Sequence, residues 1–290
     1  MSDTVQTFFA IVAIAILVWV LPYLWRSWRF RQLRSRALTR EQKLLLQEAL
    51  PLYRYLPPGL RAELESNVSL IVQDKEFVGC EGLVITEQIR VSIAAFAGLL
   101  LLQREHRCYP DLRTILVYPE TYIARETHFD GYIETSHDSA REGEAHYLGP
   151  VVISWSDLQQ DMRQPEHGHN VALHEFAHKL DEEDGRFDGR PLFTRSGEGR
   201  HWAAVFSREY QRLRAIREEV AHGEKAHTVL DLYGAESPAE FFAVATEAFF
   251  VTPHALRAQH ADLYGELRSF YRLDPAQLLP VNPPANQWSG

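Results

Sequence analysis

A long apolar stretch lies within the first 25 residues. No charged side chain occurs between Val5 and Trp25, and this length matches the roughly 20 residues that a helix needs to cross a bilayer. Five arginines follow between residues 26 and 36, which neither a buried core helix nor a cleaved signal peptide would explain. Basic residues that follow a span stay in the cytoplasm. The pattern predicts a transmembrane anchor at residues 5–25 and a basic juxtamembrane segment at 26–40. It places the chain in the inner cell membrane as a single-pass protein, with the amino terminus outside and the residues after the anchor in the cytoplasm.

The next hydrophobic positions recur with helical spacing. A helix is expected from a cap at Thr39 to about Leu52, and a second from Pro58 into the 60s. A third helix, from a cap at Thr86 to about Arg104, is apolar on nearly every side. Such a helix is expected to be buried.

Short apolar runs predict strands at residues 114–118 (TILVY), at 151–155 (VVISW) and, more weakly, at 82–86. From Asn170 the pattern is helical, at about 170–181, 199–222, 237–252 and 255–272. The Pro- and Asn-rich tail, residues 279–290, is expected to be disordered. Helices before and after a few strands predict an α+β domain, mainly helical with a small sheet, and not a doubly wound one.

Charge and cysteine content narrow the class of protein. Residues 1–40 hold six of the 30 basic residues and one of the 39 acidic ones, which leaves a net charge of −14 on the rest of the chain. Such a body repels nucleic acid, so no direct nucleic-acid binding is expected. Cys80 and Cys108 match no metal-binding spacing. They are expected to be buried free thiols, with a disulfide as the less favoured alternative.

The segment 170–181, NVALHEFAHKLD, contains two histidines four residues apart with a glutamate after the first. On a helix, His174 and His178 lie one turn apart on one face, so both imidazoles can bind one metal ion. Glu175 falls beside that face, where it could act as a general base. The alternative is a chance match with two solvated histidines. The capped, amphipathic helix favours a zinc hydrolase.

A catalytic zinc ion needs a third protein ligand and an open fourth position. Asp184 is one candidate, although no glycine precedes it to allow an easy turn. Glu240 is a better one, although Ser237 and Glu240 also form a capping-box pattern that could explain this glutamate structurally. Glu236 and Glu247 compete with it, so spacing alone leaves the third ligand open.

Four segments carry a resemblance to a known family: ILVYP (115–119), GPVVISW (149–155), HEFAHKLD (174–181) and DLYGAESPAEFFAV (231–244). Through them the chain resembles the Mlc titration factor A family of zinc-dependent peptidases, whose active site is similar to that of anthrax lethal factor. The matching segments span roughly residues 40 to 275.

The resemblance implies a zincin-like metallopeptidase domain, here residues 41–278, with one zinc ion per chain. It implies that Glu240 is the third ligand beside His174 and His178, and that Tyr233 faces the site. A phenol there can donate a hydrogen bond to the oxyanion that forms during hydrolysis. The family also implies a peptide or protein substrate, aminopeptidase-like activity and a transcriptional repressor as partner. The apparent anchor is a departure from the pattern of a family member that is a soluble cytosolic protein.

Two functions of different classes follow. One is a membrane-tethered zinc metallopeptidase with its catalytic domain in the cytoplasm. The other is a membrane-tethered binding protein that sequesters a repressor or another partner and has a largely structural zinc site. Glu175 favours the enzyme, because a structural site is more often closed by a fourth ligand and has no use for a base.

Overall fold

The computed structural model describes residues 20–21, 32, 36–104, 108–120, 149–193, 198–224 and 228–281. Most of the predicted anchor (5–25), of the basic segment (26–40) and of the predicted tail (279–290) therefore lies outside the described residues. None of the helices in the described part of the chain combines the length and the apolar character that a membrane-spanning helix needs.

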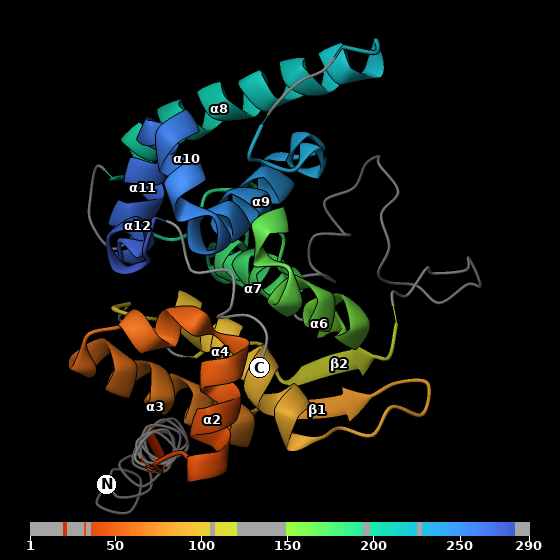
Figure 1. Cartoon of the computed structure of the whole chain (residues 1–290), viewed down its shortest axis with the longest axis vertical. Coiled ribbons are helices and arrows are strands. Elements are labelled where there is room, and N and C mark those ends of the chain that lie inside the picture. Colours follow the sequence, from red (N-terminus) through yellow and green to blue (C-terminus); the bar gives the residue numbers. More distant parts are fainter. Residues whose placement is uncertain are drawn as a thin grey trace, which may run out of the picture.

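In the part of the chain that the structure describes, the N-terminal elements are a group of helices and a small sheet (Figure 1). The helices are α2 (Arg40–Ala49), α3 (Pro58–Asp74) and α4 (Glu87–Leu100), and a short 3-10 turn, η1 (Pro51–Tyr55), follows α2. The strands are β1 (Glu76–Gly79), β2 (Thr114–Tyr118) and β3 (Val151–Ser154), all parallel in the order β1-β2-β3. The prediction of a mainly helical domain with a small sheet is confirmed.

The predicted strand at residues 82–86 is wrong. Gly82 lies in a turn with a φ of 81°, and the strand is β1, which comes earlier and pairs with β2. Leu83 and Ile85, the apolar residues that suggested a strand, pack against the core from an irregular segment before α4. Trp155, predicted as the end of a strand, instead begins α6 (Trp155–Arg163), which Ser154 caps.

The C-terminal part of the chain is helical. It contains α6, α7 (Val171–Asp181), α8 (Glu198–Ala221), α9 (Pro238–Val251), α10 (Pro253–Gln259), α11 (Ala261–Tyr271) and α12 (Pro275–Leu278), with short 3-10 turns η2 (Pro165–His167), η3 (Glu182–Asp184) and η4 (Leu232–Ala235). The helix predicted over 255–272 is broken at His260. This buried residue leaves the helical conformation and pairs with Glu209 of α8, with Nδ1 2.8 Å from the carboxylate.

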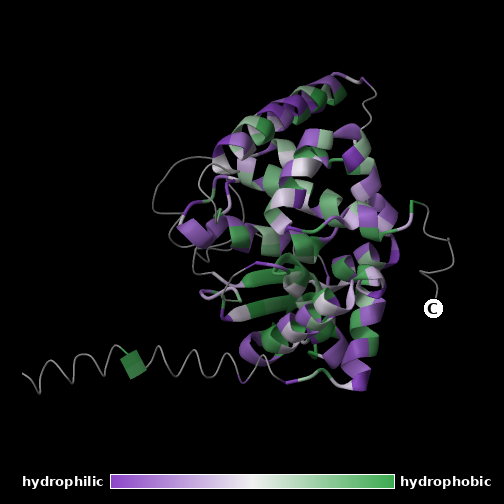
Figure 2. Cartoon of the chain, turned by 90° about the vertical axis from the view of Figure 1, so that its left-hand side faces the viewer, coloured by the Kyte–Doolittle hydropathy of each residue, from purple (hydrophilic) through white to green (hydrophobic). Residues whose placement is uncertain are grey.

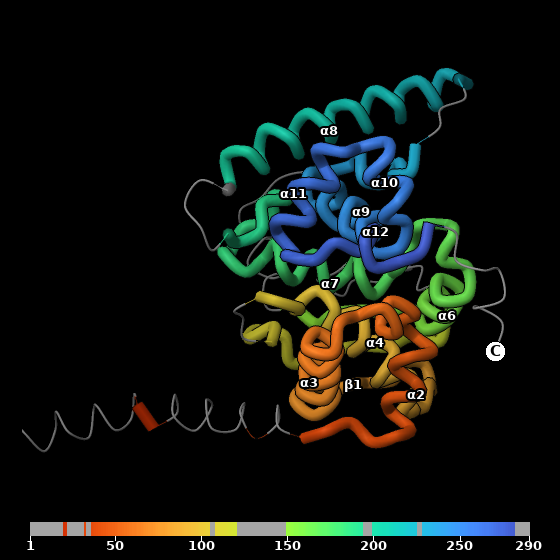
Figure 3. Tube along the Cα trace, turned by 60° about the vertical axis from the view of Figure 1, so that its left-hand side comes forward, coloured from red at the N-terminus to blue at the C-terminus, as the bar shows by residue number. Residues whose placement is uncertain are grey.

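Helix α7 occupies the middle of the molecule and packs against α4, β3 and α9 (Figure 1). Helices α8, α10 and α11 in turn contact α9 (Figure 3). Apolar residues line the strands, whereas the outermost helix, α8, is largely hydrophilic (Figure 2). Both cysteines are free thiols, as predicted, but only Cys108 is buried and Cys80 is half-buried. The packing of α7 against α9 positions the site.

Candidate metal centre

Helix α7 carries the two-histidine motif because its sequence specifies a capped, one-sided helix. Asn170 caps it, and its side-chain oxygen accepts a hydrogen bond from the backbone N–H of Leu173 at 2.9 Å. Leu173, Phe176 and Leu180 are buried in the core. As the spacing predicts, this leaves His174 and His178 on the opposite face, where each side chain keeps about a tenth of its surface exposed.

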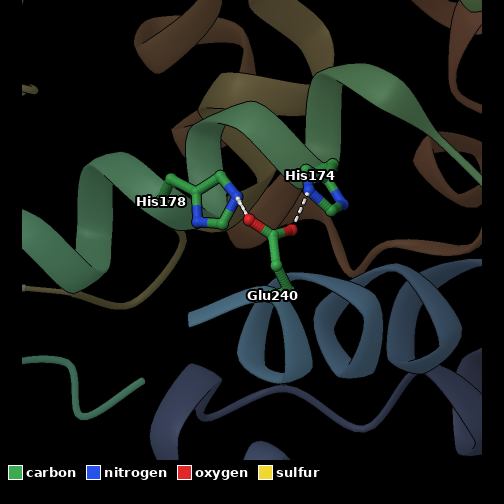
Figure 4. A group of neighbouring side chains, drawn as sticks. All are labelled: His174, His178 and Glu240. Atoms are coloured by element: carbon green, nitrogen blue, oxygen red, sulfur yellow. Dashed lines mark hydrogen bonds and ion pairs between the residues drawn. The ribbon is translucent and has the colours of Figure 1, made fainter. Parts of the chain in front are cut away.

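Helix α9 supplies a carboxylate from its first turn. Ser237 caps this helix and accepts a hydrogen bond from the backbone N–H of Glu240 at 3.1 Å, with Pro238 at the first helical position. The Glu240 side chain, however, points at the two histidines of α7 (Figure 4). The capping pattern therefore explains where α9 begins. The direction of the Glu240 carboxylate instead follows from its contacts with His174 and His178.

Two imidazoles and one carboxylate converge on a single position (Figure 4). His174 Nε2 lies 2.9 Å from Glu240 Oε2, and His178 Nε2 lies 3.4 Å from Glu240 Oε1. One ligand atom from each residue lies within 4.8 Å of the others. A tetrahedral zinc ion with bonds of about 2.0–2.1 Å separates its ligand atoms by roughly 3.3 Å. The donor set and its spacing therefore fit a zinc ion with minor adjustment.

The other acidic candidates lie elsewhere. Asp184 is exposed, and its carboxylate accepts a hydrogen bond from the backbone N–H of Arg186 at 3.0 Å. Glu236 forms a surface ion pair with Arg217 at 3.0 Å. Glu247 is buried but contacts the other nitrogen of His174. Of the carboxylates that spacing left open, Glu240 alone joins both histidines in the described metal-binding group.

Burial and charge act together on this group. Burial alone would raise the pKa of Glu240, but hydrogen bonds from His174 and His178 outweigh it and lower that pKa to about 2. Glu240 is thus an anion over the whole physiological range, as a metal ligand must be. Burial raises the pKa of the Glu175 carboxyl, and the neighbouring histidines oppose this shift. A raised pKa is typical of a carboxylate that accepts protons near neutral pH.

Glu247 links His174 to the start of its own helix. Its Oε1 accepts a hydrogen bond from His174 Nδ1 at 2.7 Å, and its Oε2 accepts one from the backbone N–H of Asn170 at 2.6 Å. Because a carboxylate only accepts, Nδ1 carries a proton, and this leaves Nε2, the nitrogen that faces Glu240, as the one that could bind a metal. His178 Nδ1 has no such partner among the described residues. Glu247 therefore orients one of the two imidazoles.

A second carboxylate extends this network to the surface. Asp161 of α6 accepts a hydrogen bond from the backbone N–H of Val171 at 2.8 Å and lies 3.3 Å from His169 Nδ1. The hydrogen bond to Asp161, helped by Glu247 and opposed by partial burial, raises the pKa of His169 to about 9. His169 is therefore a cation at neutral pH, and its Nε2 lies 3.6 Å from Glu247 Oε2. Its charge balances that of Glu247.

Two aromatic rings flank the histidines. The Tyr233 ring, on η4, lies 5.9 Å from the His174 ring, and the Phe187 ring lies 4.9 Å from the His178 ring, measured between centroids. Both aromatic side chains are exposed. The structure thus brings Tyr233 beside the metal-binding group, where the resemblance implied it.

Sequence reasoning did not find Asp161, His169 or Phe187, and it considered Glu247 only as a competing ligand. Asp161 and His169 lie just before the motif helix, in a segment for which no helix was predicted. Phe187 lies in a loop, where a lone aromatic residue gives no pattern. The sequence offered one signal for Asp161 and His169: both are polar residues close to the two-histidine motif, where they could contact it.

Comparisons with known proteins identify relatives of this chain. The model of a family described as glucose-regulated metallo-peptidase M90 matches residues 25–272. An uncharacterized protein of Synechocystis sp. is 39% identical over 267 residues, which cover 91% of this chain and 95% of that protein. Proteins named Mlc titration factor A from Yersinia pestis and Yersinia pseudotuberculosis are 28% identical over 230 residues, 78% of this chain and 82% of theirs.

Proposed function

Because this chain belongs to the glucose-regulated metallo-peptidase M90 family, we propose that it is a zinc-dependent peptidase with a zincin-like catalytic domain. His174, His178 and Glu240 hold the ion, and Glu175 is the general base. The observation that carries the proposal is the convergence of two imidazole nitrogens and one carboxylate from α7 and α9. The substrate is a peptide or a protein.

Each residue of the proposed site has a separate role in the reaction. A zinc ion held by His174, His178 and Glu240 would act as a Lewis acid, which would polarise the scissile carbonyl and lower the pKa of a water molecule. Glu175 takes a proton from the attacking water and returns it to the leaving amine. Glu247 keeps His174 in the tautomer that a metal requires. Tyr233 donates a hydrogen bond to the developing oxyanion.

The direct test is hydrolysis itself. Zinc-loaded, full-length protein is incubated with a mixture of synthetic peptides, and the products are identified by mass spectrometry. Cleavage that a chelator abolishes and added zinc restores supports the proposal. Successive loss of N-terminal residues would establish aminopeptidase-like action. Intact peptides under all zinc conditions would refute it.

A binding function is the second candidate, and one observation favours it: several relatives carry the name Mlc titration factor A. We propose that a transcriptional repressor is a partner or a substrate of this chain, which would give the peptidase a regulatory role. A pure sequestering protein would bind the repressor and leave it uncut. A time course of repressor and enzyme on a gel separates these outcomes.

We predict that Tyr233→Phe lowers kcat by about 100-fold, because loss of one oxyanion donor costs about that much. Zinc content and KM should change little, since the hydroxyl would act mainly in the transition state. Steady-state kinetics and metal analysis check this. Tyr55→Phe, which removes a hydroxyl from the η1 turn far along the chain, is the matched control. A Tyr233→Phe protein with the wild-type kcat would leave Tyr233 as a packing residue.

We also predict the topology, which rests on the sequence of residues 1–40. Tags at both ends should place the amino terminus outside the cell and residue 290 inside, with the protein in the membrane fraction. Deletion of residues 1–38 should release it, because the apolar stretch is then missing. A carboxyl-terminal tag that external protease removes from intact cells would reverse the orientation.

A further inference from the structure

Phe187 is an exposed aromatic residue next to the metal-binding group. It lies in the loop between η3 and α8, and 45% of its surface is exposed. Its ring centroid is 4.9 Å from that of His178, and the rings are inclined by 47°. Tyr233, 40% exposed, lies against His174 in a similar way. The two rings therefore form apolar walls beside the two histidines.

The loop that carries Phe187 is anchored two residues further on, at Gly189. The backbone N–H of Gly189 donates to Asp181 Oδ2 at 2.8 Å, and its carbonyl accepts a hydrogen bond from Trp202 Nε1 at 3.1 Å. Asp181 and Trp202 are both fully buried. A Cβ on Gly189 would lie 2.3 Å from the carbonyl oxygen of Pro238, so the loop approaches the start of α9 as closely as glycine allows.

This anchoring has a consequence for Phe187. Its neighbours Arg186 and Asp188 line a cavity of about 250 Å³ on the loop, whereas the Phe187 ring packs on His178. The contact with His178 and the anchored backbone at Gly189 restrict the ring before any ligand binds, and such restriction lowers the entropic cost of recognition. An exposed aromatic ring gains favourable contacts when an apolar group covers it.

We propose that Phe187 forms one wall of the substrate subsite beside the metal centre, and that this subsite accepts an apolar side chain, aliphatic or aromatic, next to the cleaved bond. The proposal rests on the proposed peptidase function. It names the substrate class: peptides with a hydrophobic residue at that position. Phe187 is a specificity-determining residue and not a member of the proton-transfer machinery.

The test compares the hydroxamates of leucine and of glycine, which bind zinc through the same group and differ only in the side chain. Calorimetric titration of zinc-loaded, full-length protein should show that leucine hydroxamate binds about tenfold more tightly, as expected for an added apolar side chain in a hydrophobic subsite. Phe187→Ala should reduce this ratio to about twofold, whereas Phe187→Leu should keep most of it. The exposed Leu44 on α2 provides a control, since Leu44→Ala should leave the ratio unchanged.

The outcomes separate the two proposals. An equal loss of affinity for both hydroxamates in Phe187→Ala, expected if the ring only supports His178, would overturn the subsite. So would a wild-type protein that binds both equally. A wild-type protein that prefers leucine hydroxamate but cleaves no peptide would support the subsite and refute the peptidase.

Discussion

A Glu175→Gln variant is expected to lose about 10²–10⁴-fold in the rate of peptide hydrolysis, the usual contribution of a general base. The amide has the size of the carboxylate but cannot accept the proton of the attacking water. Glu175 is not part of the metal-binding group, so the variant should keep one zinc ion per chain. Peptide cleavage rates and metal analysis of the purified full-length protein check both expectations.

Glu236→Gln is the matched control, because Glu236 lies just before α9 and its carboxylate forms an exposed ion pair with Arg217. Such pairs contribute little, so its rate and zinc content should remain those of the wild type. Equal hydrolysis by the wild type and Glu175→Gln would exclude Glu175 as the base. Peptides left uncut by both proteins, with zinc bound, would favour the sequestering function instead.

The motif helix could be predicted from the sequence because its determinants are local. Asn170 supplies the cap, Leu173 and Phe176 supply the buried side, and the spacing of four puts both histidines on the other side. The same holds for α4, whose cap at Thr86 and apolar sequence predict its start and its burial. Local patterns of this kind survive folding because the tertiary contacts agree with them.

The third ligand could not be assigned from spacing, because it depends on how α9 crosses α7. Glu240 and Glu247 both face α7, but the first-turn carboxylate reaches the Nε2 atoms of the histidines and the later one reaches Nδ1 of His174. The resemblance to a family favoured Glu240, and the structure places its carboxylate next to both histidines. The two carboxylates contact different atoms of His174.

The remaining misses also depend on distant contacts. β1 contains only two large apolar residues, Phe77 and Val78, and it becomes a strand because β2 lies beside it. His260 interrupts a predicted helix, and its buried side chain contacts the carboxylate of Glu209, 51 residues earlier. Neither partner can be identified from local periodicity.

Loss of any of the three proposed ligands is expected to remove zinc. The zinc content should fall from about one ion per chain to nearly none in each of the variants His174→Ala, His178→Ala and Glu240→Ala. The reason is that a catalytic site holds its metal through three protein ligands. Peptide hydrolysis should be abolished with it. Thermal unfolding gives a measurement that does not depend on activity. Zinc at about 1,000 times its Kd should raise the free energy of unfolding of the wild type by about 4 kcal/mol, and the variants should lose this stabilisation.

Glu247→Gln should behave differently from the ligand variants, because it changes only the group behind His174. The amide can still accept from His174 Nδ1, but it lacks the charge that favours the correct tautomer, and loss of such a partner costs about 10–100-fold in metal affinity. Zinc should therefore bind at saturating concentration and be removed more easily by a chelator. Zinc titration against a competing chelator measures the difference, with Glu236→Ala as the unchanged control. Normal zinc occupancy in Glu240→Ala, with loss of zinc in Glu247→Gln, would contradict this assignment. It would indicate that Glu247 is the metal ligand and that Glu240 is not.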